Sequence, residues 1–332
     1  MLQAVFFFKK TSQKEIKNFE LIKEEGYFIP LKIYGYSQTN IPFLEVNIGN
    51  MMIPAIIDLG FQGMFSLPVD LIKKIDEKKW IKHSRNYGLK GRIYEDNVYE
   101  FEGLKIENMS FPSVKMQDKC LESLHEGVLT GTRPEKYPFG AIGWELFTEY
   151  NLLVDCRYYI LALCDSLRTL KQQNYPIDDF IEVPLISNSG FLMIEAETEK
   201  GILRCLLDTG CTLNMLNIDF ENGSRDHQTF NTSADEQFLL NSKNEDSFIF
   251  NHEITQELSS FKVEGKELGP ITFKQIKSPI EFDAILGMEF FDSHLVFIDF
   301  ENWKVHIAPY PKETWPKPNL RPTIGPYRFY KL

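Results

Sequence analysis

The stretch Cys205-Leu206-Leu207-Asp208-Thr209-Gly210-Cys211-Thr212 carries a run of apolar residues into an aspartate in a short, glycine-containing loop. A similar stretch occurs earlier in the chain, Ala55-Ile56-Ile57-Asp58-Leu59-Gly60-Phe61. Each apolar run predicts a buried strand, and each strand ends at the carboxylate. The sequence therefore predicts two scaffolds that present Asp58 and Asp208 from equivalent loops, as a site with paired carboxylates requires.

The composition is that of a globular chain with room for two domains. The 332 residues are 43% hydrophobic and 25% charged, which is ordinary for such a protein. The 27 Phe and 14 Tyr residues favour strands. A net charge of −11 argues against a nucleic-acid partner, because neutralising phosphates requires clustered Lys and Arg. No apolar run reaches the roughly 20 residues needed to span a membrane.

The cysteine and histidine patterns predict neither a disulfide framework nor a metal site. The five cysteines are odd in number and have no paired spacing, so reduced thiols and a cytoplasmic location are expected. His125-Glu126 and His252-Glu253 lack the second histidine that a zinc hydrolase helix needs. The apolar residues 2–8 have no basic residue before them, which argues against a signal peptide.

The apolar patterns predict a mainly β chain with short helices. Residues 43–48 and 51–57 form a candidate hairpin across Gly49-Asn50, and its second strand leads into Asp58. The spacing over 66–81 predicts a surface helix. Other strands are expected in the ranges 27–34, 100–114, 152–163, 180–186, 191–198, 202–207, 259–263, 271–276 and 295–307.

The two halves of the chain repeat an ordered set of features. Phe139 to Phe147 parallels Phe282 to Phe291, and Leu152-Leu153-Val154-Asp155 falls on Val296-Phe297-Ile298-Asp299. Such a repeat indicates a duplicated unit. We predict a lead-in over 1–26, a first lobe over 27–164, a linker over 165–179, a second lobe over 180–308 and a proline-rich tail over 309–332.

This ordered set resembles the retropepsin-like aspartic proteases. Their unit is a strand, an Asp-Thr/Ser-Gly loop, a flap hairpin and a strand that ends in two apolar residues and Gly. The first half has Ile57-Asp58-Leu59-Gly60 with Ala141-Ile142-Gly143, and the second has Leu207-Asp208-Thr209-Gly210 with Ile285-Leu286-Gly287. The resemblance implies two retropepsin-like lobes fused in one chain, as in pepsin-like enzymes, with the site between them. A chain that holds both lobes is expected to act as a monomer.

The resemblance also implies an aspartic endopeptidase that acts on a peptide or protein and uses no metal and no cofactor. In that family the two carboxylates share one proton and activate a water molecule. Asp58 and Asp208 take this role here, and Gly60 and Gly210 allow the loops to approach closely. The hydroxyl of Thr209 would bond across to the opposite loop. A candidate flap is the turn Gly88-Leu89-Lys90-Gly91.

The first loop departs from the family pattern. Leu59 stands where the family has a hydroxyl residue, and Phe61 stands where a small residue such as Cys211 is usual. Three outcomes follow from this departure: a protease with an asymmetric site, a slow or specialised protease, or an inactive protease-like protein that binds peptides or proteins. The polar range 221–247 is either the flap of the second lobe or a surface insertion.

Overall fold

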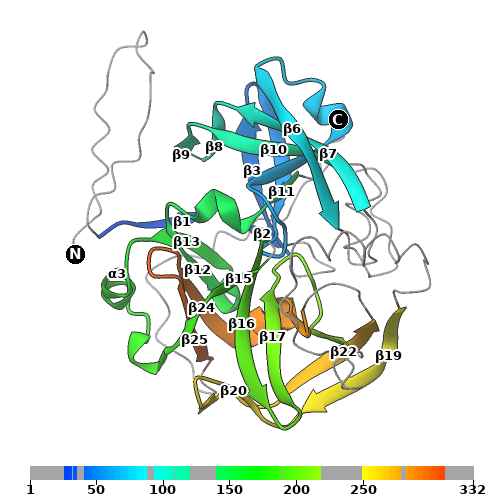
Figure 1. Ribbon diagram of the computed structural model, residues 1–332. Coiled ribbons are helices and arrows are strands. Elements are labelled where there is room, and N and C mark those ends of the chain that lie inside the picture. The colour runs from blue at the N-terminus through cyan, green and yellow to red at the C-terminus, as the bar shows by residue number, and fades with distance from the viewer. Residues whose placement is uncertain are drawn as a thin grey trace.

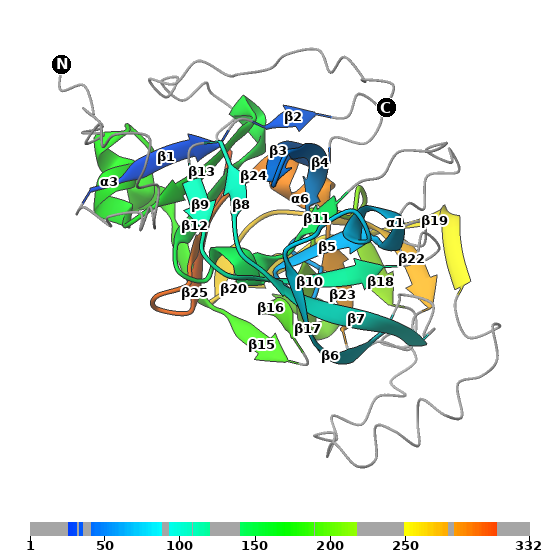
Figure 2. The ribbon, with the colours of Figure 1, turned by 90° about the horizontal axis from the view of Figure 1, so that it is seen from above.

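The computed structural model describes residues 26–31, 33–35, 41–87, 93–107, 109–119, 140–188, 190–217, 249–277 and 282–310. These residues form two β lobes that are joined by a shared sheet, as Figure 1 shows. Figure 2 gives the view from above, in which the first lobe lies over the second. In Figure 1 the first lobe lies at the top and the second at the bottom. The predicted bilobed, all-β fold with short helices is confirmed.

The described part of the first lobe is built on a ten-stranded sheet. In sheet order its strands are β6 (Lys78–Tyr87), β7 (Ile93–Phe101), β10 (Val114–Lys119), β5 (Phe65–Pro68), β11 (Gly140–Ile142), β4 (Met51–Ile57), β3 (Pro42–Ile48), β8 (Leu104–Ile106) and β9 (Met109–Phe111), with β2 (Tyr34–Gly35) beside β3. Strand β11 runs parallel to β4 and antiparallel to β5. The predicted hairpin is present, because β3 and β4 pair around residues 49–50.

The second lobe repeats this arrangement in a nine-stranded sheet of described residues. Its strands are β19 (Ile249–Leu258), β22 (Ile271–Lys277), β18 (Met215–Asn217), β23 (Ala284–Leu286), β17 (Gly201–Leu207), β16 (Phe191–Thr198), β20 (Phe261–Val263) and β21 (Lys266–Glu267), with β15 (Ile186–Asn188) beside β16. Strand β23 runs parallel to β17 and antiparallel to β18, as β11 does with β4 and β5. The strand order thus supports the internal duplication.

A six-stranded sheet joins the two halves. Its strands are β1 (Phe28–Leu31), β13 (Ile160–Cys164), β12 (Asn151–Asp155), β24 (His294–Asp299), β25 (Lys304–Pro309) and β14 (Ile181–Pro184). Strands β12 and β24 pair antiparallel at its centre, with Leu153 opposite Phe297. Both side chains are fully buried, so the lobes are held together by a continuous apolar layer.

The described helices are short. They are α1 (Val69–Ile72), η1 (Trp144–Phe147), η2 (Cys156–Tyr158), α3 (Leu167–Gln172), η3 (Ile177–Asp179) and α6 (Met288–Ser293). Among the described residues, no helix is both long enough and apolar enough to cross a membrane. The predicted linker range contains α3 and η3, and Leu170 and Tyr175 within it are buried.

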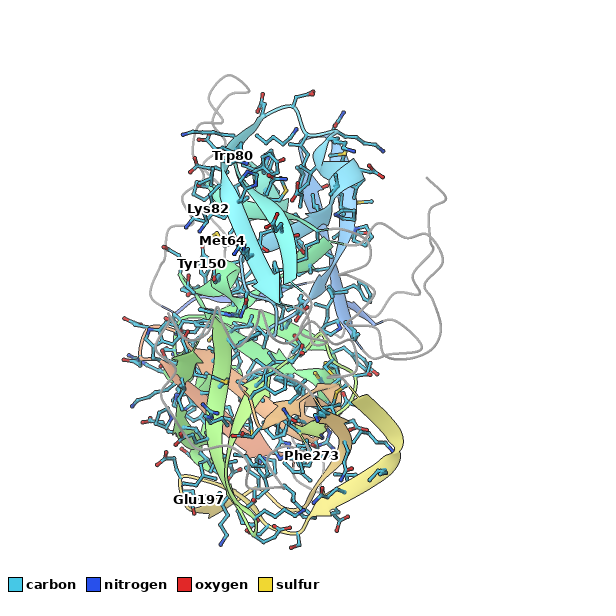
Figure 3. All side chains as sticks on the ribbon, turned by 45° about the vertical axis from the view of Figure 1, so that its right-hand side comes forward. Met64, Trp80, Lys82, Tyr150, Glu197 and Phe273 are labelled. Atoms are coloured by element: carbon cyan, nitrogen blue, oxygen red, sulfur yellow. The ribbon has the colours of Figure 1, made fainter. Side chains whose placement is uncertain are left out.

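The prediction of a surface helix over 66–81 is wrong. Residues 65–68 form β5, which is buried between β10 and β11, and only one helical turn follows before β6 begins at Lys78. Trp80 and Lys82 lie on β6, the outermost strand of the sheet, and both are exposed (Figure 3). Pairing of β6 with β7 therefore overrides the local helical spacing.

Several sequence predictions concern residues outside the described part of the chain. They are the candidate flap Gly88-Leu89-Lys90-Gly91 and the ranges 1–25, 221–247 and 311–332. The two strands on either side of the candidate flap, β6 and β7, are described and form an antiparallel pair.

Candidate active site

Asp58 follows β4 directly, in the interior of the first-lobe sheet. Its backbone N–H donates to the carbonyl oxygen of Ile142 on β11 at 2.9 Å. The N–H of Phe61 then donates back to the carbonyl oxygen of Asp58 at 3.1 Å, which closes a tight turn. These bonds fix the point at which the Asp58 side chain leaves the sheet.

Asp208 is placed in the same way in the second lobe. Its N–H donates to the carbonyl oxygen of Leu286 on β23 at 3.0 Å, and the N–H of Cys211 donates to the carbonyl oxygen of Asp208 at 3.3 Å. The N–H of Gly210 also donates to Oδ1 of the Asp208 carboxyl group at 2.8 Å. The two loops therefore share one backbone design.

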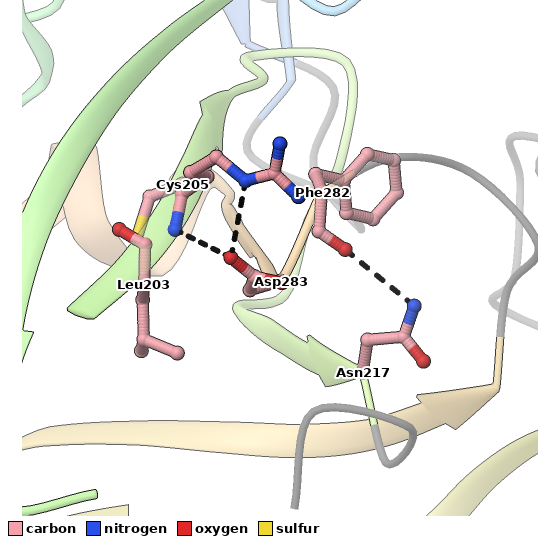
Figure 4. Close-up of polar contacts among 6 residues, drawn as sticks. Leu203, Cys205, Asn217, Phe282 and Asp283 are labelled. Carbon is pink, nitrogen blue, oxygen red and sulfur yellow. Dashed lines mark hydrogen bonds and ion pairs between the residues drawn. The ribbon is translucent and has the colours of Figure 1, made fainter. Parts of the chain in front are cut away.

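Strand β23 is anchored beside β17 by a buried carboxylate (Figure 4). Oδ2 of Asp283 accepts from the backbone N–H of Arg204 at 2.8 Å and from its Nε at 3.5 Å. Next to it, the side-chain amide of Asn217 donates to the carbonyl oxygen of Phe282 at 3.5 Å. Strand β17 leads directly into Asp208, and Leu286 on β23 accepts the N–H of Asp208, so these contacts help to hold the Asp208 loop in place.

The two loops meet, and the side chains of Asp58 and Asp208 are hydrogen-bonded to each other. The glycines make this approach possible. A Cβ atom on Gly60 would lie 2.5 Å from Cγ of Asp208, and one on Gly210 would lie 2.5 Å from Cγ of Asp58. Any side chain at either glycine would collide with the opposite carboxyl group.

Thr209 ties the loops together across the lobe boundary. Its Oγ1 donates to the carbonyl oxygen of Ile57 at 2.6 Å and accepts from the N–H of Leu59 at 3.1 Å. Thr209 is fully buried, so both bonds are shielded from water. Leu59 is equally buried but has no hydroxyl group, and the first loop cannot return this contact through its side chain.

Burial and mutual repulsion favour a shared proton. Burial raises the pKa of Asp208 well above its usual range, and the neighbouring Asp58 raises it further, against the backbone N–H groups of Gly210 and Cys211. Burial also raises the pKa of Asp58, but the positive charge of Lys119 and the hydrogen bond with Asp208 oppose this rise. A pair in this setting holds one proton over a broad pH range.

Lys119 and Phe61 flank the pair on the first-lobe side. The ammonium group of Lys119 lies over the ring of Phe61, 4.0 Å from its centroid. Sequence reasoning singled out Phe61 but missed Lys119. The repeat contained a signal, because Gln117-Asp118-Lys119 in β10 falls on Gln275-Ile276-Lys277 in β22 when the strands are matched by register.

The structure thus brings together Asp58, Asp208, Gly60, Thr209 and Gly210 from the predicted site. Among the described residues, no group of three or more His, Cys, Asp and Glu side chains is arranged to hold a metal ion. The described cysteines, Cys156, Cys164, Cys205 and Cys211, are free thiols.

Comparison with known proteins identifies similar folds. The chain is similar to basic 7S globulin from soybean, with a TM-score of 0.52 and 10% sequence identity over 85% of this chain and 94% of that one. It also matches conglutin gamma, a basic 7S globulin from lupine seeds, with a TM-score of 0.46 and 10% identity over 86% of this chain and 95% of that one. No protein-family model and no curated protein matches the sequence. At this identity, the soybean match shows a shared fold alone.

Proposed function

We propose that the chain is an aspartic endopeptidase that hydrolyses peptide bonds with Asp58 and Asp208. The observation that carries this proposal is the hydrogen-bonded carboxyl pair at the meeting point of two equivalent loops. Gly60 and Gly210 each lie against the carboxyl group of the opposite loop, where there is no room for a side chain. This packing is expected if the two carboxyl groups must lie close together. The raised pKa values favour the singly protonated pair that this chemistry requires.

The singly protonated pair can act as base and acid in one step. The carboxylate takes a proton from a bound water while the water oxygen bonds to the peptide carbon. The carboxyl group donates its proton to the carbonyl oxygen, which gives a tetrahedral intermediate. In the second step the C–N bond breaks, the nitrogen takes the proton from the first group, and the intermediate's hydroxyl returns a proton to the second.

Peptide cleavage by single variants tests the proposal. A mixed peptide library is incubated across a pH series with wild type, Asp58→Asn and Asp208→Asn, and products are identified by mass spectrometry. We expect cleavage by wild type and a loss of about a thousandfold in each variant, since acid–base catalysis contributes roughly 10²–10⁴-fold. Asp70→Asn is the control, because Asp70 lies exposed on α1. Equal cleavage by wild type and both dyad variants would refute the proposal.

The second candidate function is binding of a peptide or protein without hydrolysis. Leu59 and Phe61 favour it, because they break the family pattern in the first loop. The comparisons also favour it over hydrolysis, since the soybean protein with the similar fold is named as a globulin. Retention of both aspartates and both glycines in contact supports the first candidate instead.

Binding and turnover can be separated in one design. Library peptides that wild type retains in an affinity selection are recovered and checked for cleavage. The second candidate predicts intact peptides, retained equally by wild type and Asp208→Asn. Products that appear with wild type and vanish with Asp208→Asn would rule it out.

A further inference from the structure

Lys119 places a positive charge beside one member of the carboxyl pair. It is the last residue of β10, it is half-buried, and its ammonium group lies 4.0 Å from the centroid of the Phe61 ring. A cation over an aromatic face is attracted by the ring quadrupole, so the ring helps to hold this charge in place. Phe61 belongs to the Asp58 loop, since its N–H donates to the carbonyl oxygen of Asp58.

The groups that act most strongly on the Asp58 carboxyl come from both lobes. The backbone N–H groups of Gly60 and Phe61 and the charge of Lys119 lie on the first-lobe side, and the Asp208 carboxyl lies opposite. The thiol of Cys211 also lies nearby, and burial raises its pKa, so it is neutral. Lys119 therefore supplies the positive charge in this set and favours the ionised form of Asp58.

The second lobe does not repeat this device. Strand register places Lys277 at the position that matches Lys119. The residue that matches Phe61 is Cys211, which has no aromatic ring to attract a cation. Burial and the charge of Asp58 both raise the pKa of Asp208. Asp208 is also the more buried of the two, at 9% exposure, whereas Asp58 keeps more of its surface accessible.

We propose that Lys119 is a positioning residue that holds the negative charge of the pair on Asp58, which makes Asp58 the base and Asp208 the acid. This inference rests on the proposed function for its catalytic meaning. Asp58 then takes the proton from the attacking water, and Asp208 gives its proton to the carbonyl oxygen of the substrate. In this role Lys119 acts through the charge of Asp58 and exchanges no proton with the substrate.

The pH profile of peptide cleavage tests this role. Without the lysine charge, Asp58 takes up a proton at higher pH, so the acid limb of kcat/KM in Lys119→Met should move up by about one pH unit. Lys119→Arg keeps a charge over the ring and should keep the wild-type limb. Lys277→Met is the matched control and should leave the limb unchanged. An unshifted limb in Lys119→Met, with wild-type unfolding behaviour, would overturn the proposal.

A titration independent of activity separates this inference from the proposed function. Aspartate carboxyl carbons are labelled with carbon-13 and followed by NMR across pH, with Asp58→Asn and Asp208→Asn used to assign the two signals. We expect the Asp58 signal of Lys119→Met to titrate at higher pH than in wild type, and in Lys277→Met it should not move. If wild type cleaves nothing but the Asp58 signal shifts, the proposed function fails and the role of Lys119 stands. If cleavage occurs and the signal does not shift, the role of Lys119 fails alone.

Discussion

The two aspartate loops share their backbone bonds and their glycines but differ in the residue between Asp and Gly. Gly60 and Gly210 both lie against the opposite carboxyl group, so close approach is required from both sides. The hydroxyl contact exists on one side only, where Thr209 satisfies the N–H of Leu59 and the carbonyl of Ile57. A hydroxyl on one loop is thus enough to join the two loops, whereas each loop needs its own glycine.

The same asymmetry extends around the pair. On the first-lobe side, the ring of Phe61 makes a cation–π contact with Lys119. Its counterpart Cys211 instead donates its thiol hydrogen to the carbonyl oxygen of Leu213 at 3.2 Å. The first loop, which has no hydroxyl between Asp58 and Gly60, is thus the loop whose aromatic ring lies under a cation. The glycines and Thr209 therefore hold the two aspartates together, whereas Lys119 and Phe61 affect where the negative charge of the pair lies.

Replacing either glycine tests the symmetric part of this comparison and should have the largest effect. In Gly60→Ala or Gly210→Ala the new methyl group would displace the opposite carboxyl group, so cleavage should fall about a thousandfold, like the loss of an acid–base group. Peptide cleavage and chemical denaturation measure activity and stability separately. The exposed turn at Gly265 offers the control Gly265→Asn, since nothing lies near its Cβ position and Asn tolerates its positive φ of 69°.

Equal losses in the two glycine variants would support equivalent roles for the loops. A variant at Gly60 that stays active would show that the Asp58 loop can move away from Asp208, and the close approach would then be required from one side only.

Removing the single hydroxyl tests the asymmetric part. Thr209→Val keeps the shape of the side chain but leaves the Leu59 N–H and the Ile57 carbonyl buried without their partner. Each such group costs roughly 1–3 kcal/mol, so the free energy of unfolding should fall by about 4 kcal/mol. Chemical denaturation measures this change. Thr148→Val is the control, because Thr148 makes a comparable bond to the Glu145 carbonyl at an exposed site. A loss no larger than that of the control would mean that Thr209 does not join the lobes.

Local patterns predicted most of this fold. The apolar runs before Asp58 and Asp208 do form buried strands, and the repeat of features along the chain corresponds to the matching strand order of the two sheets. These predictions succeeded because a buried strand has a pattern of apolar residues that can be recognised from neighbouring positions in the sequence. The range 66–81 failed because β5 is stabilised by partners from distant parts of the chain.

The same limit applies to the site. The aspartates and glycines are recognisable from their motif. Lys119 is brought over Phe61 in the Asp58 loop only by the pairing of β10 with β5 and by the fold of that loop. Likewise, the sequence indicates that Thr209 has a hydroxyl, while its two partners depend on how the lobes meet. Contacts between distant strands carry information that no local spacing contains.

A buried carboxyl in the shared sheet gives a pH-dependent test of the difference between the halves. Asp155 is fully buried and accepts from the hydroxyl of Tyr310 at 2.8 Å, while its counterpart Asp299 accepts from the N–H and side-chain amide of Asn302. Burial raises the pKa of Asp155 to about 6. Between the unfolded and the folded pKa, Asp155 is protonated in the folded protein and ionised in the unfolded chain. Protonation of Asp155 therefore stabilises the folded protein at pH 4, and this contribution is lost as the pH rises through 6.

Asp155→Asn removes this titration and should flatten the pH dependence of stability by about 2 kcal/mol between pH 4 and pH 7.5. Unfolding is measured in an Asp208→Asn background, which removes the titration of Asp208 from the pH dependence of stability. A slope unchanged by Asp155→Asn would show that this carboxyl ionises as it does in the unfolded chain.

Restoring a hydroxyl to the first loop should have the smallest effect on stability. In Leu59→Thr a return bond from the first loop to the second would contribute about 1 kcal/mol. Leu59 is fully buried, however, and the smaller side chain gives up roughly as much apolar contact. We therefore expect a change within about 1 kcal/mol in the free energy of unfolding, together with a gain in cleavage rate because the pair is held from both sides. A double-mutant cycle with Thr209→Val tests this: if the effects of the two substitutions add without a coupling term, the two hydroxyls do not act on a common joint between the loops.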